Sequence, residues 1–185
     1  MKSLRIVLPA AAVLLAAILG SQVLVEADGK RRRSRSLRAT LEGFQETPAV
    51  STSASGRFRA RLSYDDSFFE YELRYRDLES DITQAHIHFA QKGVSGGISV
   101  WLCTTAAITT APAGTPDCGG PRSGIVTGII AAAQVLGPGT QGISAGDFEA
   151  LLDALREDVT YANVHSATFG AGEIRGQIRD SDGRD

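Results

Sequence analysis

Two neighbouring stretches of the chain alternate strictly between apolar residues and charged or polar residues. In residues 57–64, and again in residues 69–76, aromatic or aliphatic side chains occupy every second position, with Arg, Glu or Ser between them. A period of two is the repeat of a half-buried β-strand. Asp65, Asp66 and Ser67 between the stretches predict a short turn, so the two stretches should form a β-hairpin with its charges facing solvent.

Six further stretches predict strands, because they combine β-branched or aromatic residues with flanking turn residues. The apolar stretch over residues 123–135 is expected to be a buried strand. Together with the hairpin, these stretches predict an all-β fold, an antiparallel β-sandwich of seven or more strands. The six stretches are residues 37–44, 82–89, 98–103, 123–135, 161–166 and 172–179.

One short helix interrupts the β pattern and is expected over residues 146–157. Ser144 can cap its N-terminus, and Asp147 three residues later completes a capping box. The apolar residues recur at helical spacing, so one face of the helix should pack on an edge or end of the sandwich. These residues are Phe148, Leu151, Leu152 and Leu155.

The N-terminal segment is organised like a signal peptide. Lys2 and Arg5 precede an apolar run, and Val25-Glu26-Ala27 provides a cleavage site after Ala27. The alternative is an uncleaved membrane anchor, because the apolar run is about long enough to span a bilayer. We therefore expect four regions, namely a signal peptide or anchor (residues 1–27), a basic disordered arm (28–36), one domain (37–180) and a charged tail (181–185).

Charge divides the chain into a basic arm and an acidic domain. Residues 30–38 carry six Lys or Arg and no acid, whereas the chain from Ala39 onward has 19 acidic and 11 basic residues, a net charge of −8. The arm is expected to be a solvated tether, with contact to anionic lipid or another polyanion as the alternative. Aromatic residues do not interleave with its charges, so we expect no nucleic-acid partner.

The chain has two cysteines, Cys103 and Cys118, which bracket a stretch rich in Thr, Ala, Pro and Gly. In an exported protein, an even pair around a flexible loop predicts a disulfide. The alternative is a thiolate metal site shared with histidines.

The chain has three histidines, His86, His88 and His165, all within predicted strands. Side chains two residues apart share a strand face, so His86 and His88 point the same way. If the two strands are neighbours, the three imidazoles can converge to bind copper or zinc, with one coordination position left open.

The alternative is that these histidines belong to a structural polar network. Such a network would satisfy the ring nitrogens with backbone carbonyls, Asn163 or the carboxylate of Glu173. Glu173 and Arg175 are expected to share a strand face and to form a salt bridge.

Four stretches, in order, carry a resemblance to a known family. They are residues 41–50 (LEGFQETPAV), 85–88 (AHIH), 161–166 (YANVHS) and 172–178 (GEIRGQI). The chain resembles the CHRD domain, which is repeated in chordin and occurs singly in many bacterial exported proteins. Ala162 and Ser166 replace the more usual Val and Thr, and the segment after His165 lacks the Asn-Pro often found there.

The resemblance implies an immunoglobulin-like β-sandwich or barrel, remotely similar to copper–zinc superoxide dismutases. It implies no general enzymatic activity. The growth-factor role of chordin depends on other modules, so the resemblance does not extend that role to this chain. Three histidines are fewer than a dinuclear dismutase site needs, so a metal site would be mononuclear.

Two functions remain open. The first is a non-enzymatic binding or structural module, exported to the periplasm, the cell surface or the extracellular space, with a protein, matrix or cell-surface partner. The alternative is a mononuclear copper or zinc protein with weak redox activity. The sequence has no nucleophile elbow and no phosphate-binding glycine loop.

Overall fold

The computed structural model describes residues 35–181. The expected signal peptide or anchor, nearly all of the basic arm and most of the charged tail lie outside the described residues. Within residues 35–181, no helix has the length and apolar character needed to cross a membrane.

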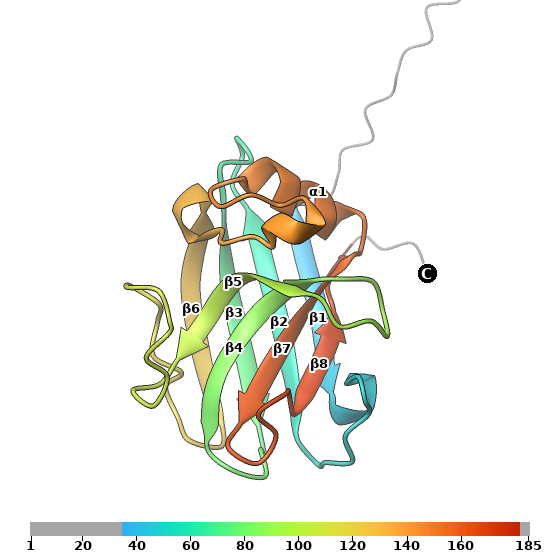
Figure 1. The fold of residues 1–185 in the computed structure, drawn as a ribbon, viewed down its shortest axis with the longest axis vertical. Coiled ribbons are helices and arrows are strands. Elements are labelled where there is room, and N and C mark those ends of the chain that lie inside the picture. The colour runs from blue at the N-terminus through green and yellow to red at the C-terminus, as the bar shows by residue number, and fades with distance from the viewer. Residues whose placement is uncertain (1–34, 182–185) are drawn as a thin grey trace, which may run out of the picture. The chain divides into compact units, whose positions relative to one another are not determined.

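Antiparallel pairing joins the strands into one sheet, in the order β5-β4-β7-β8-β1-β2-β3-β6, with β9 beside β1. The sheet folds into two layers, with β4, β5, β7 and β8 in front and β1, β2, β3 and β6 behind (Figure 1). The predicted all-β class is therefore confirmed. The strands are β1 (Ser36–Glu42), β2 (Ser55–Leu62), β3 (Phe68–Arg76), β4 (Ile82–Phe89), β5 (Gly97–Thr104), β6 (Gly124–Ala131), β7 (Thr160–Ser166), β8 (Ile174–Gln177) and β9 (Arg179–Asp180).

Contacts between the layers nearly close the sheet into a barrel where its two end strands, β5 and β6, approach one another. The Tyr71 hydroxyl of β3 donates a hydrogen bond to the Leu102 carbonyl of β5. Cys103 of β5 is joined to Cys118, which precedes β6 in the chain. These contacts hold together the side of the barrel that has no strand pairing.

The core lies between the layers and takes the apolar residue from every second strand position, as the alternation in the hairpin predicts. Phe58 and Leu73 are cross-strand partners and are fully buried, whereas their neighbours Arg57 and Arg74 are exposed. Inward-facing aromatic and aliphatic side chains provide the main stabilisation, because their burial removes apolar surface from water.

Helix α1 (Phe148–Arg156) covers one end of the barrel (Figure 1). Its predicted apolar face is buried, and the expectation that it packs at an end is confirmed. The predicted cap was wrong, because the Asp147 carboxylate, and not Ser144, accepts a hydrogen bond from the Ala150 amide. Asp147 is therefore the cap itself, and the helix begins one residue after it.

The strand expected over residues 123–135 is shorter and less buried than predicted. Strand β6 ends at Ala131, and a 3₁₀ turn (η2, Ala132–Gln134) follows. Ile125 and Ile129 are 54 % and 57 % exposed, because β6 is an end strand of the sheet with one face open to solvent. The continuous apolar sequence of residues 123–135 therefore did not mean that both faces of β6 are buried.

Two other strands are also shorter than predicted. Strand β1 ends at Glu42, where a 3₁₀ turn (η1, Gly43–Gln45) begins, and the last predicted strand divides into β8 and β9. A further 3₁₀ turn (η3, Gly139–Gln141) precedes the helix.

Candidate metal centre

Strands β4 and β7 are hydrogen-bonded neighbours, and this pairing brings the two histidine motifs together. His86 lies opposite Asn163, and His88 lies opposite Tyr161. Ala85 and Ile87, which alternate with the histidines, belong to the hydrophobic core. The histidines therefore lie on the outer face of the front layer, away from the core.

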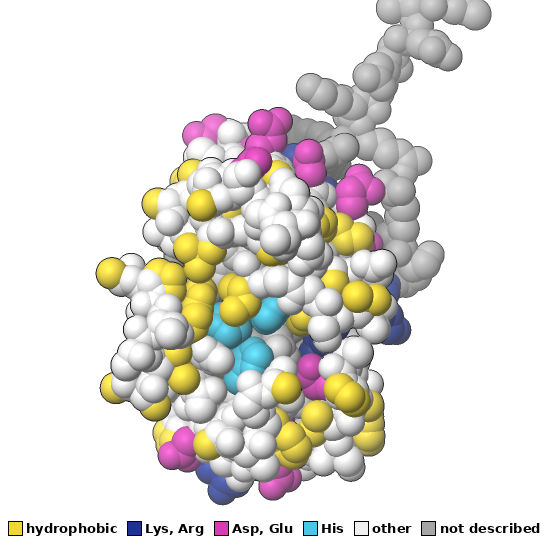
Figure 2. All heavy atoms as spheres, in the orientation of Figure 1, with side chains coloured by type: hydrophobic (Ala, Val, Ile, Leu, Met, Phe, Trp, Pro, Cys, Tyr) yellow, Lys and Arg dark blue, Asp and Glu magenta, His cyan; other side chains and the backbone are white. Residues whose placement is uncertain are grey.

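The three imidazoles form a compact group, which we call the histidine cluster (His86, His88 and His165). One nitrogen from each ring lies within 4.8 Å of the others, and His86 Nδ1 is 3.2 Å from His165 Nε2. The residues are only 1 %, 8 % and 6 % exposed. Figure 2 shows their side chains at the bottom of a hollow, bordered mainly by hydrophobic and uncharged atoms. The prediction that the three side chains cluster is confirmed.

Two backbone carbonyls fix the tautomers of two rings. His88 Nδ1 is 3.0 Å from the Gly96 carbonyl, and His165 Nδ1 is 3.0 Å from the Gly170 carbonyl. A carbonyl oxygen only accepts, so each Nδ1 donates, and in the neutral ring each Nε2 then carries the lone pair. Both rings therefore present Nε2 as their ligand atom.

The protonation of His86 follows from that of His165. Because His165 Nε2 can only accept, His86 Nδ1 donates to it, and the lone pair of His86 lies on Nε2. Among the described residues, His86 Nε2 and His88 Nε2 are buried and have no hydrogen-bond partner. The cluster thus contains two desolvated lone pairs that the protein leaves unsatisfied.

The surroundings keep the imidazoles neutral. Burial, followed by repulsion from His165 and His88, lowers the pKa of His86 to about 2. Burial is also the main reason that the pKa of His88 is lowered to about 4, with smaller effects from His165 and Arg175. Burial lowers the pKa of His165 as well. At pH 7 all three rings are therefore uncharged, which is the form that binds a metal ion.

Aromatic contacts hold two of the rings in place. The edge of His86 meets the Trp101 ring, with centroids 4.3 Å apart, and His88 stacks on Tyr161 at 4.9 Å. The Arg175 guanidinium lies 3.4 Å from the centroid of the Tyr161 ring. Arg175 also donates to the Val94 carbonyl, so it links the stacked pair to the loop that carries Gly96.

The expected polar network around the histidines is only partly present. Backbone carbonyls do bond His88 and His165, but the Asn163 amide donates instead to Glu46 and to the Ile174 carbonyl. Glu46 was missed by the sequence reasoning, because it lies 117 residues from Asn163 along the chain. Burial raises the pKa of Glu46 to about 7, against the opposing effects of Asn163 and Arg175.

The predicted salt bridge between Glu173 and Arg175 was wrong. Strand β8 begins only at Ile174, so Glu173 lies outside the regular alternation of that strand. Its carboxylate accepts hydrogen bonds from the Thr52 hydroxyl and the Glu79 amide, away from the histidine cluster.

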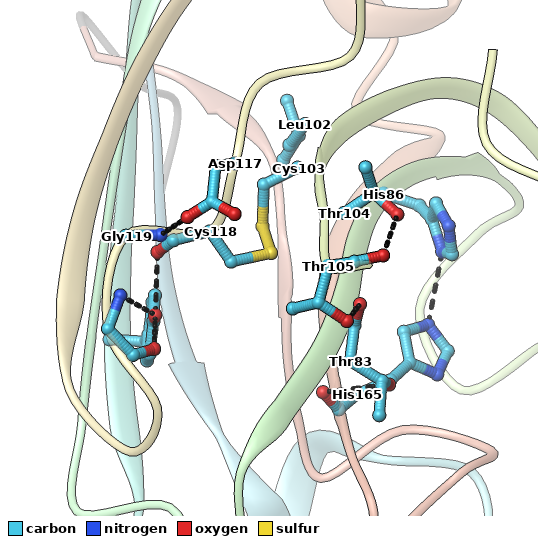
Figure 3. The surroundings of a disulfide bond; sticks show 12 residues. Thr83, His86, Leu102, Cys103, Thr104, Thr105, Asp117, Cys118, Gly119 and His165 are labelled. Carbon is cyan, nitrogen blue, oxygen red and sulfur yellow. Dashed lines mark hydrogen bonds between the residues drawn. A yellow bond between two sulfur atoms is a disulfide. The ribbon is translucent and has the colours of Figure 1, made fainter. Parts of the chain in front are cut away.

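The cysteines form the predicted disulfide, with Cα atoms 5.0 Å apart. Figure 3 shows this bond on one side and the hydrogen bond between His86 and His165 on the other. Between them lie three threonines, Thr83, Thr104 and Thr105, whose hydrogen bonds reach the His165 carbonyl. Because both sulfur atoms are in the disulfide, the alternative of thiolate metal ligands is excluded in this structure.

A comparison of the sequence with models of protein families finds a match. The model of the CHRD domain matches residues 37–178, which include every strand that contributes to the histidine cluster. The chain therefore belongs to the CHRD-domain family. No curated protein and no solved structure matches it.

Proposed function

We propose that this protein is an exported, non-enzymatic binding module and that His86, His88 and His165 hold one copper or zinc ion. The observation that carries the proposal is the pair of buried, unpartnered Nε2 atoms on His86 and His88. Buried polar atoms in proteins are almost always hydrogen-bonded, so a purely structural network would be expected to satisfy these nitrogens. A metal ion would occupy both lone pairs.

The hydrogen bonds to the Gly96 and Gly170 carbonyls support the same proposal. Histidines that bind metals usually donate their second N–H to a carbonyl or carboxylate, which fixes the ring and its tautomer. His88 and His165 both have this arrangement. In the metal-free protein, His165 Nε2 accepts a hydrogen bond from His86 Nδ1 at 3.2 Å, so an ion held by all three histidines would replace this hydrogen bond.

The donor set favours copper or zinc over harder ions. Neutral imidazole nitrogens suit zinc and copper, whereas magnesium and calcium prefer oxygen ligands. The whole chain has three histidines, so one ion is the capacity of an all-imidazole site. Export is supported by the signal-peptide pattern of residues 1–27 and by the disulfide, which is typical of oxidising compartments.

A metal titration of protein purified without a histidine tag tests the proposal. We expect the wild type to bind one equivalent of copper or zinc, and His88→Ala to bind it at least 100-fold more weakly. The matched control is Gln84→Ala, which changes the same face of β4 but removes no imidazole, and it should bind like the wild type. Circular dichroism establishes that each variant is folded.

Two outcomes of the metal titration would contradict the proposal. If the wild type binds neither metal while His88→Ala lowers the melting temperature, the histidines have a structural role and the proposal is wrong. If His88→Ala binds the ion as tightly as the wild type, the ion binds elsewhere and the proposal is also wrong.

A further inference from the structure

Positive charge gathers on one sheet face of a domain that is acidic as a whole. The exposed outer face of β1, β2 and β3, which we call the arginine face, carries six arginines and three glutamates, although the chain from Ala39 onward has a net charge of −8. Such segregation creates a local positive potential that attracts anions. The arginines are Arg38, Arg57, Arg59, Arg61, Arg74 and Arg76, and the glutamates are Glu42, Glu70 and Glu72.

Strand register divides this face into two halves. In one half, Arg59 and Arg61 of β2 lie directly opposite Glu72 and Glu70 of β3, and Arg59 also lies opposite Arg38 of β1. In the other half, Arg57 lies opposite Arg74. Like charges directly opposite one another destabilise a sheet, and an anion bound between them would relieve the repulsion.

The Arg57 half of the face is also hollowed. A groove of about 750 Å³ crosses β1, β2, β3 and the start of β6, and we call it the arginine groove. Adjacent strands are about 4.8 Å apart, so a groove across four strands extends for about 14 Å. Its lining includes Thr40, Glu42, Arg57, Arg74, Arg76 and Ile125.

The three groove arginines differ in how far the protein itself engages their guanidinium groups. Among the described residues, Arg57 makes no ion pair, whereas Arg76 Nε donates a hydrogen bond to the Ser55 hydroxyl and lies 3.9 Å from an Asp77 carboxylate oxygen. Arg74 is held by both carboxylate oxygens of Glu72, at 2.7 and 2.9 Å, which fixes the orientation of its guanidinium. A guanidinium binds planar or tetrahedral oxyanions through paired hydrogen bonds.

We propose that the arginine groove binds a linear anionic polysaccharide and that Arg57, Arg74 and Arg76 hold its carboxylate or sulfate groups. The shape of the site distinguishes this partner from a membrane. A groove about 14 Å long can hold a single polymer chain, with Ile125 against the apolar face of a sugar ring. A bilayer surface would instead contact charges that protrude. The site lies on the opposite layer from the histidine cluster and does not depend on metal binding.

Binding of defined polyanions to the full processed chain tests this proposal. The probes are polygalacturonate, dextran sulfate and vesicles of equal parts phosphatidylcholine and phosphatidylglycerol, measured by calorimetry at physiological salt. We expect the wild type to bind at least one polysaccharide. Arg57→Ala/Arg76→Ala should weaken this binding at least 10-fold, whereas Arg59→Ala/Arg61→Ala removes the same charge outside the groove and should weaken it less than threefold.

Three results would overturn the proposal. The first is a wild type that binds neither polysaccharide. The second is an equal loss of affinity in the two double variants, which would indicate attraction by net charge alone. The third is binding to the vesicles without binding to either polysaccharide, which would make a membrane the partner. All variants retain the basic arm, so it cannot account for a difference between them.

Discussion

The two layers of the barrel share one core but have very different outer faces. On the front layer, the histidine cluster lies at the bottom of a hollow, and its three side chains are at most 8 % exposed. On the back layer, the arginine face is open to water, and its arginines are exposed. The strands themselves are similar on both layers, with apolar residues inward and polar residues outward, so the difference lies in how deeply the outer-face side chains are buried.

Solvent determines what each polar face can do. Burial removes water from the imidazoles, lowers their pKa values and leaves two nitrogens without a partner. The arginines stay hydrated and charged, so they can attract a large anion. Their ion pairs with the glutamates of the same face add little stability. The histidine cluster is therefore suited to a small desolvated ligand, and the arginine face to an extended one.

The largest expected effect comes from truncating a side chain in the shared core. Ile87 lies between His86 and His88 but faces inward and is fully buried. Ile87→Ala should lower the free energy of unfolding by about 2–5 kcal/mol, because it removes buried apolar surface and leaves a cavity. Ile129→Ala, at a 57 % exposed position on β6, should change it by less than about 0.5 kcal/mol. Urea unfolding measures both, and equal losses would contradict the layer arrangement.

Removal of the disulfide should have the next largest effect. The bond between Cys103 and Cys118 closes a segment of 15 residues on the side of the barrel without strand pairing. The double variant Cys103→Ala/Cys118→Ala should lose about 3 kcal/mol of unfolding free energy, because its unfolded chain is less constrained. Reduction of the wild type should cause a similar loss. A stability unchanged by reduction would show that the strands alone hold the two layers together.

Acidification should lower the free energy of unfolding through the residues of the histidine cluster. In metal-free protein, the unfolded state binds protons on His86 and His88 below pH 6.5, whereas the folded state, with pKa values of about 2 and 4, does not. Lowering the pH from 6.5 to 5.5 should therefore reduce the unfolding free energy by about 1 kcal/mol for each of these residues. This stability is present above pH 6.5 and is lost toward the folded-state pKa values.

Glu46 has the opposite effect on how the unfolding free energy depends on pH, and a variant at this position serves as the control. Its folded-state pKa, raised to about 7, means that the native state holds a proton that the unfolded chain releases above pH 4.5. Glu46 therefore gains stability as the pH falls, with the opposite sign to the histidines. Urea titrations should show a steeper loss on acidification in Glu46→Gln than in the wild type. A shallower loss in this variant would contradict the raised pKa of the buried Glu46 carboxyl.

The smallest effect is expected at the exposed ion pair of the arginine face. The charges of Glu72 and Arg74 are close to water, which screens their attraction. Glu72→Gln should leave the melting temperature unchanged within the precision of calorimetry. A clear decrease in the melting temperature would show that this exposed pair stabilises the fold. The hydrated face would then differ less from the buried face than proposed.

Much of the local structure could be predicted from the sequence. Strict alternation identified the β2–β3 hairpin, and helical spacing identified α1. The errors occurred where local pattern is ambiguous. Gly, Ala and Ile in residues 123–135 are compatible with a buried strand, with an exposed end strand or with a turn, and the position of β6 in the sheet selects among them.

For the histidine cluster, the sequence determined the residue types and the shared face of His86 and His88, because a strand has a fixed period of two. Only the tertiary structure decided that β4 lies beside β7, which brings His165 within hydrogen-bonding distance of a residue 79 positions away. It also placed the Gly96 and Gly170 carbonyls that select the tautomers, and Glu46 beside Asn163. A period shows which side a residue faces, but strand pairing across long separations depends on the packing of the whole core.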